Sequence, residues 1–222
     1  GWASYHSRLS IVDLSSGVNQ PVINHDKSQL VFNGEILNFK DLGYKYFNKS
    51  YKSDTYLLND LIVNDYLDLV ELDGFFAFVF IDSNGKLKHA CRDKFGVKPL
   101  FYYEDNNGIS FSSEPNILKH FFSTKVNPKA IKEYKAFRAP IFSGSFFKGI
   151  KQIEPGNCYI KGEYFSAEKE LYTDDLQSKS KNSLTQAIEK GVSSRCVSDA
   201  PIGLLLSKGV DSNLIRFSGD FN

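Results

Sequence analysis

Residues 207–209, Ser-Lys-Gly, interrupt an apolar run and have the composition of a phosphate-binding loop. The apolar residues 202–206 are typical of a short buried strand, and Asp211 and Ser212 then open a predicted helix. A strand, a tight polar loop and a helix N-terminus direct backbone N–H groups and the positive end of the helix dipole toward one point. Since many serine-glycine turns between a strand and a helix look similar, this loop by itself only favours an anion site.

A second group of polar residues, nearer the N-terminus, could hold a free amino acid. Arg8 offers a planar guanidinium for a carboxylate, whereas Glu35 and Asp54 offer acceptors for an ammonium group. Asn33 and the N–H of Gly34 are donors of the kind that stabilises a tetrahedral oxyanion. Together these residue types could bind an α-amino acid and polarise an amide, although such residues near turns are commonly solvated or capping.

Short strands must position this second group. Five segments are predicted as strands because turn sequences separate them: 30–34, 75–82, 86–93, 99–104 and 108–114. The Asp-Ser-Asn-Gly and Asp-Asn-Asn-Gly turns predict two hairpins among them. Helices are predicted over 53–64 and 127–135. Antiparallel strands with a few helices predict an α+β fold, an antiparallel sandwich layered with helices.

The sequence changes character after Gly162. Residues 163–179 are polar and are predicted to form an exposed linker. Apolar residues then recur at helical spacing, which predicts an amphipathic helix over 180–196. With the strand at 202–206 and the helix after it, this pattern is typical of the first α/β unit of a nucleotide-binding domain.

Composition excludes several classes of function. The chain has 222 residues, of which 41% are hydrophobic, so we expect one domain and part of another, with a substantial core. The net charge of +1, without blocks of like charge, gives no support to a nucleic-acid or membrane partner. No apolar run approaches the ~18 residues that span a bilayer.

The cysteines and histidines predict no metal site. Cys91, Cys158 and Cys196 are odd in number and widely spaced, so we expect reduced, buried thiols in a cytoplasmic protein. The four histidines form no cluster with ligand spacing. The sequence begins at Gly1 and has no methionine, from which we expect a piece of a longer reading frame.

Eight motifs occur in an order and at spacings that resemble the glutamine-dependent asparagine synthetases. They are HSRLSIVDLS, FNGEILNF, SDT, LDGFFAFVFID, RDKFGVKPLFY, FSSE, FKGIKQIEPG and SDAPIGLLLSKGVDS. Each motif is weak alone, but the ordered series covers essentially the whole chain. The resemblance implies an N-terminal-nucleophile hydrolase-like glutamine amidotransferase domain over 1–162 without its N-terminal segment. It further implies a linker over 163–179 and the beginning of an ATP-binding synthetase domain over 180–222.

The resemblance also implies roles for individual residues. The glutamine pocket would comprise Arg8, Leu9, Ser10, Ile11, Val12, Asn33, Gly34, Glu35 and Asp54. Arg8 would bind the glutamine carboxylate, Glu35 and Asp54 would bind the α-amino group, and Asn33 with Gly34 would form the oxyanion hole. The ATP-binding residues would be Leu205, Ser207, Gly209, Asp211 and Ser212.

The implied reaction is ATP-dependent asparagine synthesis. Aspartate is adenylated and then attacked by ammonia released from glutamine, which yields asparagine, glutamate, AMP and pyrophosphate. The resemblance therefore implies glutamine, aspartate and ATP as small-molecule partners, with Mg²⁺ as cofactor, and it allows a homodimer.

Three positions depart from the family pattern. The family nucleophile is a mature N-terminal cysteine, and none of the three cysteines matches it, so we expect this chain not to hydrolyse glutamine. Lys208 stands where the family usually has glycine, and it would be strained if the loop needs a positive φ there. Tyr56 follows SDT where an acidic residue is common. Outside the site, Arg92 and Asp93 are interpreted as a buried ion pair that fixes a hairpin end.

Two alternatives remain open from the sequence. The chain could belong to an amidotransferase that acts on another carboxylate, such as a uronic-acid sugar. It could also be a non-catalytic remnant that binds glutamine or a partner protein.

Overall fold

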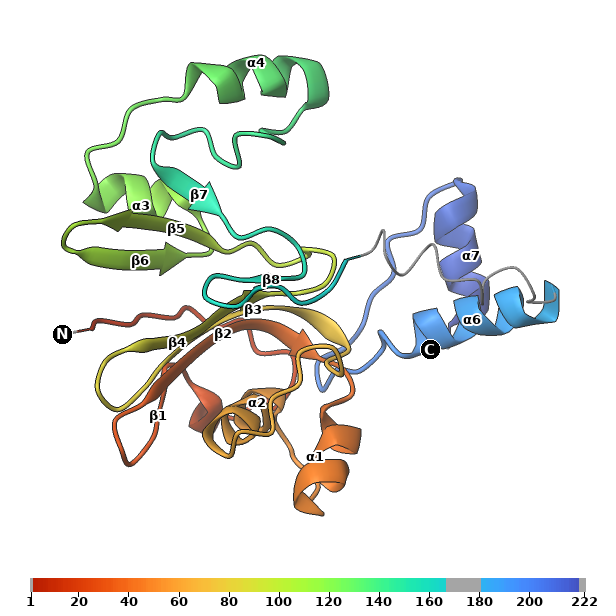
Figure 1. Cartoon of the computed structure of the whole chain (residues 1–222). Coiled ribbons are helices and arrows are strands. Elements are labelled where there is room, and N and C mark those ends of the chain that lie inside the picture. Colours follow the sequence, from red (N-terminus) through yellow and green to blue (C-terminus); the bar gives the residue numbers. More distant parts are fainter. Residues whose placement is uncertain (1, 167–180, 220–222) are drawn as a thin grey trace. The chain divides into compact units, whose positions relative to one another are not determined.

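The computed structural model describes residues 2–166 and 181–219, which divide into two compact units (Figure 1). The sheet unit comprises residues 2–6, 20–34 and 74–166, and the helical unit comprises 7–19, 35–73 and 181–219. Each unit is built from separated stretches of the chain. The domain boundaries predicted near 162 and 180 stay predictions.

The larger sheet of the sheet unit has six strands in the order β1-β2-β3-β4-β8-β9 (Figure 1). Their bounds are β1 Val22–Ile23, β2 Gln29–Ile36, β3 Gly74–Ile81, β4 Leu87–Arg92, β8 Asn157–Cys158 and β9 Gly162–Glu163. β2 runs out of the sheet unit at Gly34, and its last two residues belong to the helical unit. β3 and β4 are antiparallel, which confirms the hairpin predicted from the turn between them. Phe76 and Phe78 of β3 are fully buried.

A second sheet has three antiparallel strands in the order β6-β5-β7. They are β5 Phe101–Asp105, β6 Gly108–Ser112 and β7 Ile150–Gln152. The helix α3, Pro115–Phe121, contacts all three strands. The helix α4, Pro128–Phe137, begins as predicted at Asn127, whose side chain accepts the N–H of Lys129 at 3.1 Å.

Helices make up most of the regular structure of the helical unit. They are the short 3₁₀ helix Ser16–Val18, α1 Phe39–Phe47, α2 Asp54–Val63, α6 Lys181–Ser193 and α7 Val210–Ser218. α1 contacts α2, and α6 contacts α7. The apolar face predicted for α2 is buried, because Leu57, Leu58 and Leu61 are at most 1% exposed. No helix in the described ranges is long and apolar enough to cross a membrane.

The strand predicted over 202–206 does not form. These residues have no regular secondary structure, and Leu205 is 96% exposed. A strand needs a neighbour for its N–H and C=O groups, and no described strand pairs with this segment. The antiparallel α+β part of the predicted fold is therefore confirmed, whereas the α/β unit is not shown.

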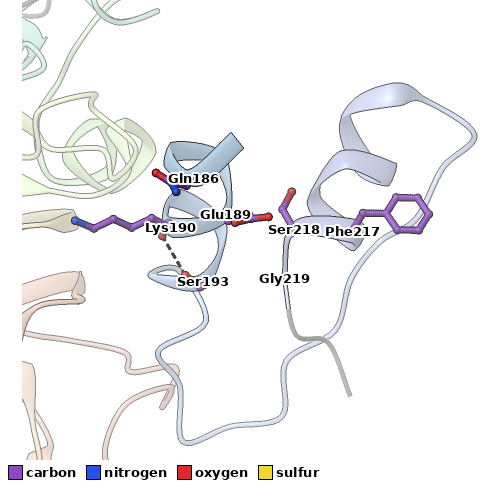
Figure 2. A pocket seen from close by; sticks show the side chains of 7 residues that line it. All are labelled: Gln186, Glu189, Lys190, Ser193, Phe217, Ser218 and Gly219. Carbon is purple, nitrogen blue, oxygen red and sulfur yellow. Dashed lines mark hydrogen bonds between the residues drawn. The ribbon is translucent and has the colours of Figure 1, made fainter. Parts of the chain in front are cut away.

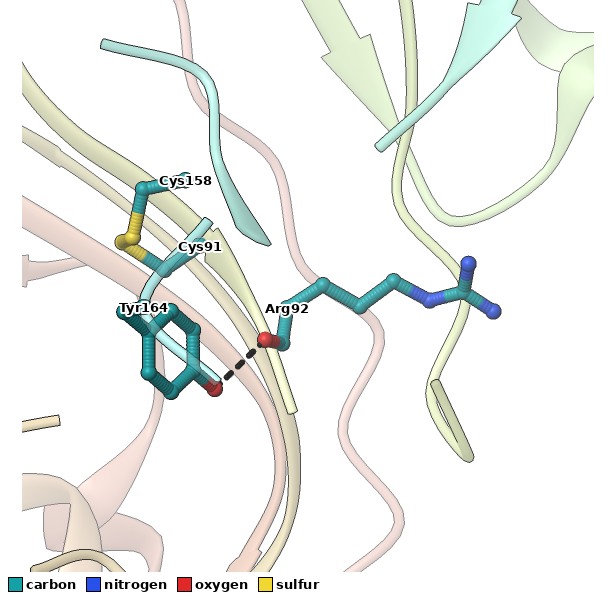
Figure 3. Close-up of a disulfide and its surroundings, with 4 residues drawn as sticks. All are labelled: Cys91, Arg92, Cys158 and Tyr164. Atoms are coloured by element: carbon teal, nitrogen blue, oxygen red, sulfur yellow. Dashed lines mark hydrogen bonds between the residues drawn. A yellow bond between two sulfur atoms is a disulfide. The ribbon is translucent and has the colours of Figure 1, made fainter. Parts of the chain in front are cut away.

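Cys91 and Cys158 form a disulfide, which corrects the expectation of reduced thiols (Figure 3). β4 and β8 are paired in a register that places the two residues opposite each other. Both are buried as expected, whereas Cys196 is free and half-buried. Beside the disulfide, the Tyr164 hydroxyl donates to the Arg92 carbonyl at 2.7 Å. Cytoplasmic location stays a prediction. The disulfide removes one of its arguments, the expectation that these cysteines are reduced.

Arg92 and Asp93 fix the turn after β4 through the backbone, which corrects the predicted ion pair. The Arg92 guanidinium donates to the carbonyls of Gly96, Lys98 and Ile153. The Asp93 carboxylate accepts the N–H groups of Phe76, Phe95, Val97 and Lys98. Both charged groups are thus compensated mainly by peptide dipoles, and the charge of the nearby Asp93 also favours the charged form of Arg92.

Candidate functional site

The end of β2 and the start of α2 are joined in the helical unit by a hydrogen bond to the buried carboxylate of Asp54. One Asp54 oxygen accepts the N–H of Ile36 at 3.0 Å, and this N–H belongs to the peptide that joins Glu35 to Ile36. Glu35 is 8% exposed and Asp54 is 4% exposed. The Asp54 carboxylate therefore contacts the backbone directly after Glu35, a predicted site residue 19 positions earlier in the sequence.

Asp54 is held at the first position of α2. Its other oxygen accepts the N–H of Thr55 at 2.7 Å, while the Ser53 side chain makes no capping hydrogen bond. Burial raises the pKa of Asp54 to about 6, against the opposing effect of the N–H bonds from Ile36 and Thr55. At neutral pH Asp54 is therefore a desolvated anion, and a cation that pairs with it gains more than it would in water.

Arg8 organises the loop that follows it. Its guanidinium donates to the carbonyls of Val12 at 2.9 Å and Ser15 at 3.0 Å, and also to that of Asp13. Three of its five N–H donors are thus used within the loop, which leaves two for a ligand. None of these bonds reaches Glu35 or Asp54, so the carboxylate-binding role of Arg8 stays a prediction.

The backbone predicted to line the pocket lies in the same loop. Leu9 is 84% exposed, whereas Val12 is buried. Ser10 and Ile11 are half-buried. Their roles toward a ligand likewise stay predictions.

Asn33 and Gly34 lie in the sheet unit, directly before Glu35 along β2. Gly34 has φ +137°, and a Cβ there would lie 2.7 Å from the Phe76 Cα and still closer to the Phe75 carbonyl oxygen. Only glycine fits this position. The backbone that carries the predicted oxyanion donor is therefore sterically fixed, while the role itself stays a prediction.

A cavity of about 730 Å³ in the helical unit borders the Arg8 loop. Its lining residues are Val12, Asp13, Leu14, Phe39, Lys40, Ser50, Tyr51, Lys52, Cys196, Val197, Ser198 and Asp199. Of these, only Val12 was among the predicted site residues. The others carried no signal in the sequence, because the cavity joins segments about 180 residues apart.

The predicted phosphate loop is closed by its own hydrogen bonds. The hydroxyls of Ser207 and Ser212 are 2.9 Å apart, and the N–H of Gly209 donates to Ser207 at 3.1 Å. Asp211 lies in the first turn of α7, whose early N–H groups have no partner within the helix. The structure thus brings together Ser207, Gly209 and Ser212, but the exposed Leu205 makes no such contact.

Lys208 is unstrained. It is not among the described residues with a positive φ other than glycine. The glycine-like conformation that would have made lysine costly is therefore not adopted here.

A second hollow, of about 610 Å³, lies between α6 and α7 (Figure 2). In Figure 2 the Lys190 side chain and the Phe217 ring point away from each other, on opposite sides of the hollow. Between them, the Glu189 side chain of α6 points toward Ser218 of α7. In the described part of the chain, no three His, Cys, Asp or Glu residues are placed to hold a metal ion.

Sequence comparisons show the family to which the chain belongs. A sequence model of the glutamine amidotransferase domain matches residues 2–172, more than half of the chain. The chain therefore belongs to the glutamine amidotransferase domain family.

Similar curated proteins include glutamine-hydrolysing asparagine synthetases. Asparagine synthetase 3 of Bacillus subtilis is 29% identical over 95% of this chain and 37% of its own length. Asparagine synthetase B of Escherichia coli is 34% identical over 95% of this chain and 35% of its own length. The amidase chyE of Penicillium rubens is 30% identical over 95% of this chain and 33% of its own length. The chain thus spans about a third of the length of these relatives.

Proposed function

We propose that this chain binds L-glutamine as part of a glutamine-dependent amidotransferase. The observation that carries the proposal is the buried Asp54 carboxylate, which accepts the N–H of Ile36, directly after the buried Glu35 at the end of β2. An ammonium group is a natural partner of a desolvated carboxylate such as that of Asp54, because the low local dielectric strengthens their attraction. Membership of the amidotransferase domain family makes the α-ammonium of glutamine the expected cation.

The remaining predicted residues complete the proposed site. Arg8 receives the glutamine carboxylate with the two N–H donors that its own loop leaves unused. Asn33 and Gly34, which precede Glu35 in β2, act as oxyanion donors to the side-chain amide. The resemblance assigns the nucleophile to none of the three cysteines, so the proposal for this chain is binding of glutamine rather than its hydrolysis.

For the whole protein we propose ATP-dependent asparagine synthesis. The similarity to glutamine-hydrolysing asparagine synthetases supports this proposal. Suitable donors for a phosphate lie at the start of α7 and in the loop before it. The helix offers its first N–H groups and the Ser212 hydroxyl, and the loop offers the Ser207 hydroxyl and the exposed Lys208. The carboxylate of Asp211 is the kind of oxygen ligand that Mg²⁺ prefers.

Titration calorimetry with L-glutamine tests the binding proposal. We expect saturable binding, and Asp54→Asn should weaken it at least tenfold because a charge-assisted hydrogen bond is lost. Asp41→Asn, an exposed carboxylate on α1 of the same unit, is the matched control and should leave the affinity unchanged. Absence of glutamine binding, or equal effects of the two substitutions, would overturn the assignment.

An acceptor other than aspartate is the second candidate. It is considered because one relative that covers 95% of this chain is named an amidase and not an asparagine synthetase. Isotope-labelled glutamine incubated with the intact protein, ATP and either aspartate or a uronic-acid sugar separates the two. Label in asparagine supports the first candidate, and label in a sugar amide supports the second.

A further inference from the structure

Asp199 is joined to the Arg8 loop by two hydrogen bonds in opposite directions. The Asp13 N–H donates to the Asp199 carboxylate at 2.7 Å, and the Asp199 N–H donates to the Ile11 carbonyl at 2.9 Å. The partners are 186 residues apart in the sequence but lie in one compact unit. Asp199 therefore fixes the backbone on both sides of Val12.

The conformation of Asp13 explains why its backbone N–H needs a hydrogen-bond acceptor from another part of the chain. Asp13 has φ +54°, which is uncommon for a residue other than glycine and must be held by its surroundings. Its own carboxylate accepts the N–H of Ser15, and hydrogen bonds from Ser15 hold the pKa of that carboxyl below its usual value. The N–H of Asp13 is thus left to Asp199.

Asp199 also borders the cavity of about 730 Å³ together with Val12 and Asp13. Arg8 holds the same loop from within, through the carbonyls of Val12, Asp13 and Ser15. The loop that presents Arg8 is therefore tied at its apex by an internal guanidinium and by a carboxylate from residue 199.

We propose that Asp199 is a positioning residue for glutamine, which holds residues 11–13 so that Arg8 and the backbone before Val12 can receive the glutamine carboxylate. The inference rests on the proposed glutamine site and adds to it a residue that contacts no substrate itself. Asp199 acts through Asp13 and Ile11, and its effect on glutamine is indirect.

A nearby pair provides a matched control on the same segment. Arg195 forms two contacts with Asp73, at 3.1 and 3.2 Å, and both side chains are about half exposed. This pair joins the segment before residue 199 to Asp73, elsewhere in the helical unit, and involves no residue of the Arg8 loop. Arg195→Ala should therefore leave glutamine affinity unchanged.

The test is calorimetry with L-glutamine on the full chain and three variants. Asp199→Ala should weaken binding about fivefold, because one charge-assisted hydrogen bond to the loop is lost. Asp199→Asn keeps a carbonyl acceptor for the Asp13 N–H and should restore affinity to within about twofold of the parent. Arg195→Ala should match the parent chain.

Hydrogen exchange at the Asp13 amide supplies a readout that global stability does not move. Its protection should fall in Asp199→Ala and persist in Asp199→Asn, while the melting temperatures of the two variants stay alike. Failure of the parent chain to bind glutamine would contradict the proposed function itself. Binding by the parent that Asp199→Ala leaves intact would overturn only the role of Asp199.

Discussion

The Ile36 N–H donates to the Asp54 carboxylate at 3.0 Å, and this bond ties the end of β2 to the first turn of α2. The peptide that donates is the one after Glu35, so this hydrogen bond joins the backbone next to Glu35 to the carboxylate of Asp54. The proposed ammonium site therefore depends on the relation of a strand end to a helix start, both of which the sequence patterns predict.

Glutamine affinity should fall as the pH is lowered through 6. Burial raises the pKa of Asp54 to about 6, so its carboxylate is largely charged at pH 7 and largely protonated at pH 5. Glutamine keeps its ammonium charge over this range, hence the dissociation constant should rise about tenfold from pH 7 to pH 5. Calorimetry at several pH values measures the change. A flat profile over this range would remove Asp54 from the ammonium site.

Gly34→Ala should prevent stable folding of the sheet unit. An added Cβ would meet the backbone of Phe75 and Phe76, which cannot move aside as a flexible side chain could. Gly108→Ala is the control, since Gly108 has a similar φ of +143° but nothing within 4 Å of the added atom. Soluble yield and melting temperature should fall sharply for Gly34→Ala. For Gly108→Ala they should fall only slightly, because the alanine meets no clash and is disfavoured only by its positive φ. Equal losses would show that the close approach at Gly34 is not limiting.

Reduction of the Cys91–Cys158 disulfide should destabilise the chain by about 4 kcal/mol, because the bond closes a long loop, with a sequence separation of 67. That loop contains β5, β6 and β7, so the constraint acts on the whole second sheet. Urea unfolding with and without dithiothreitol measures the effect. The double variant Cys91→Ala, Cys158→Ala should be insensitive to the reductant. Coincident unfolding curves for the parent chain in both conditions would contradict the prediction.

The sequence predicted those parts of the fold that local chemistry determines. The Asp-Ser-Asn-Gly turn specifies the β3–β4 hairpin, and the Asn127-Pro128 pair marks the start of α4. It did not predict the disulfide, because the register of β4 against β8 depends on 66 intervening residues. The apolar run 202–206 has the composition of a strand, but strand formation depends on a partner that no local pattern supplies.

The candidate site likewise contains residues that the sequence predicted and contacts that it did not. The residue types at Glu35 and Asp54 indicated an ammonium site, and the Asp54 carboxylate does contact the backbone N–H that follows Glu35. The contact of Asp13 with Asp199 could not be predicted, because the two residues are 186 positions apart and no local sequence pattern links them. The pairing of Arg92 with Asp93 was inferred from the sequence. In the structure, the Arg92 guanidinium donates to backbone carbonyls instead, and the Asp93 carboxylate accepts backbone N–H groups.

Asp93→Ala should be among the most destabilising single substitutions in the chain. The side chain is fully buried, and its two oxygens accept four backbone N–H groups. Removing the carboxylate leaves these donors without a partner, at a cost of about 3 kcal/mol or more. Asp105→Ala is the matched control, because Asp105 accepts a single N–H, that of Asn107, in an exposed hairpin turn. Urea unfolding should show a loss of several kcal/mol for Asp93→Ala and less than about 1 kcal/mol for Asp105→Ala. Similar small losses for both would mean that water or a rearranged turn replaces the Asp93 carboxylate.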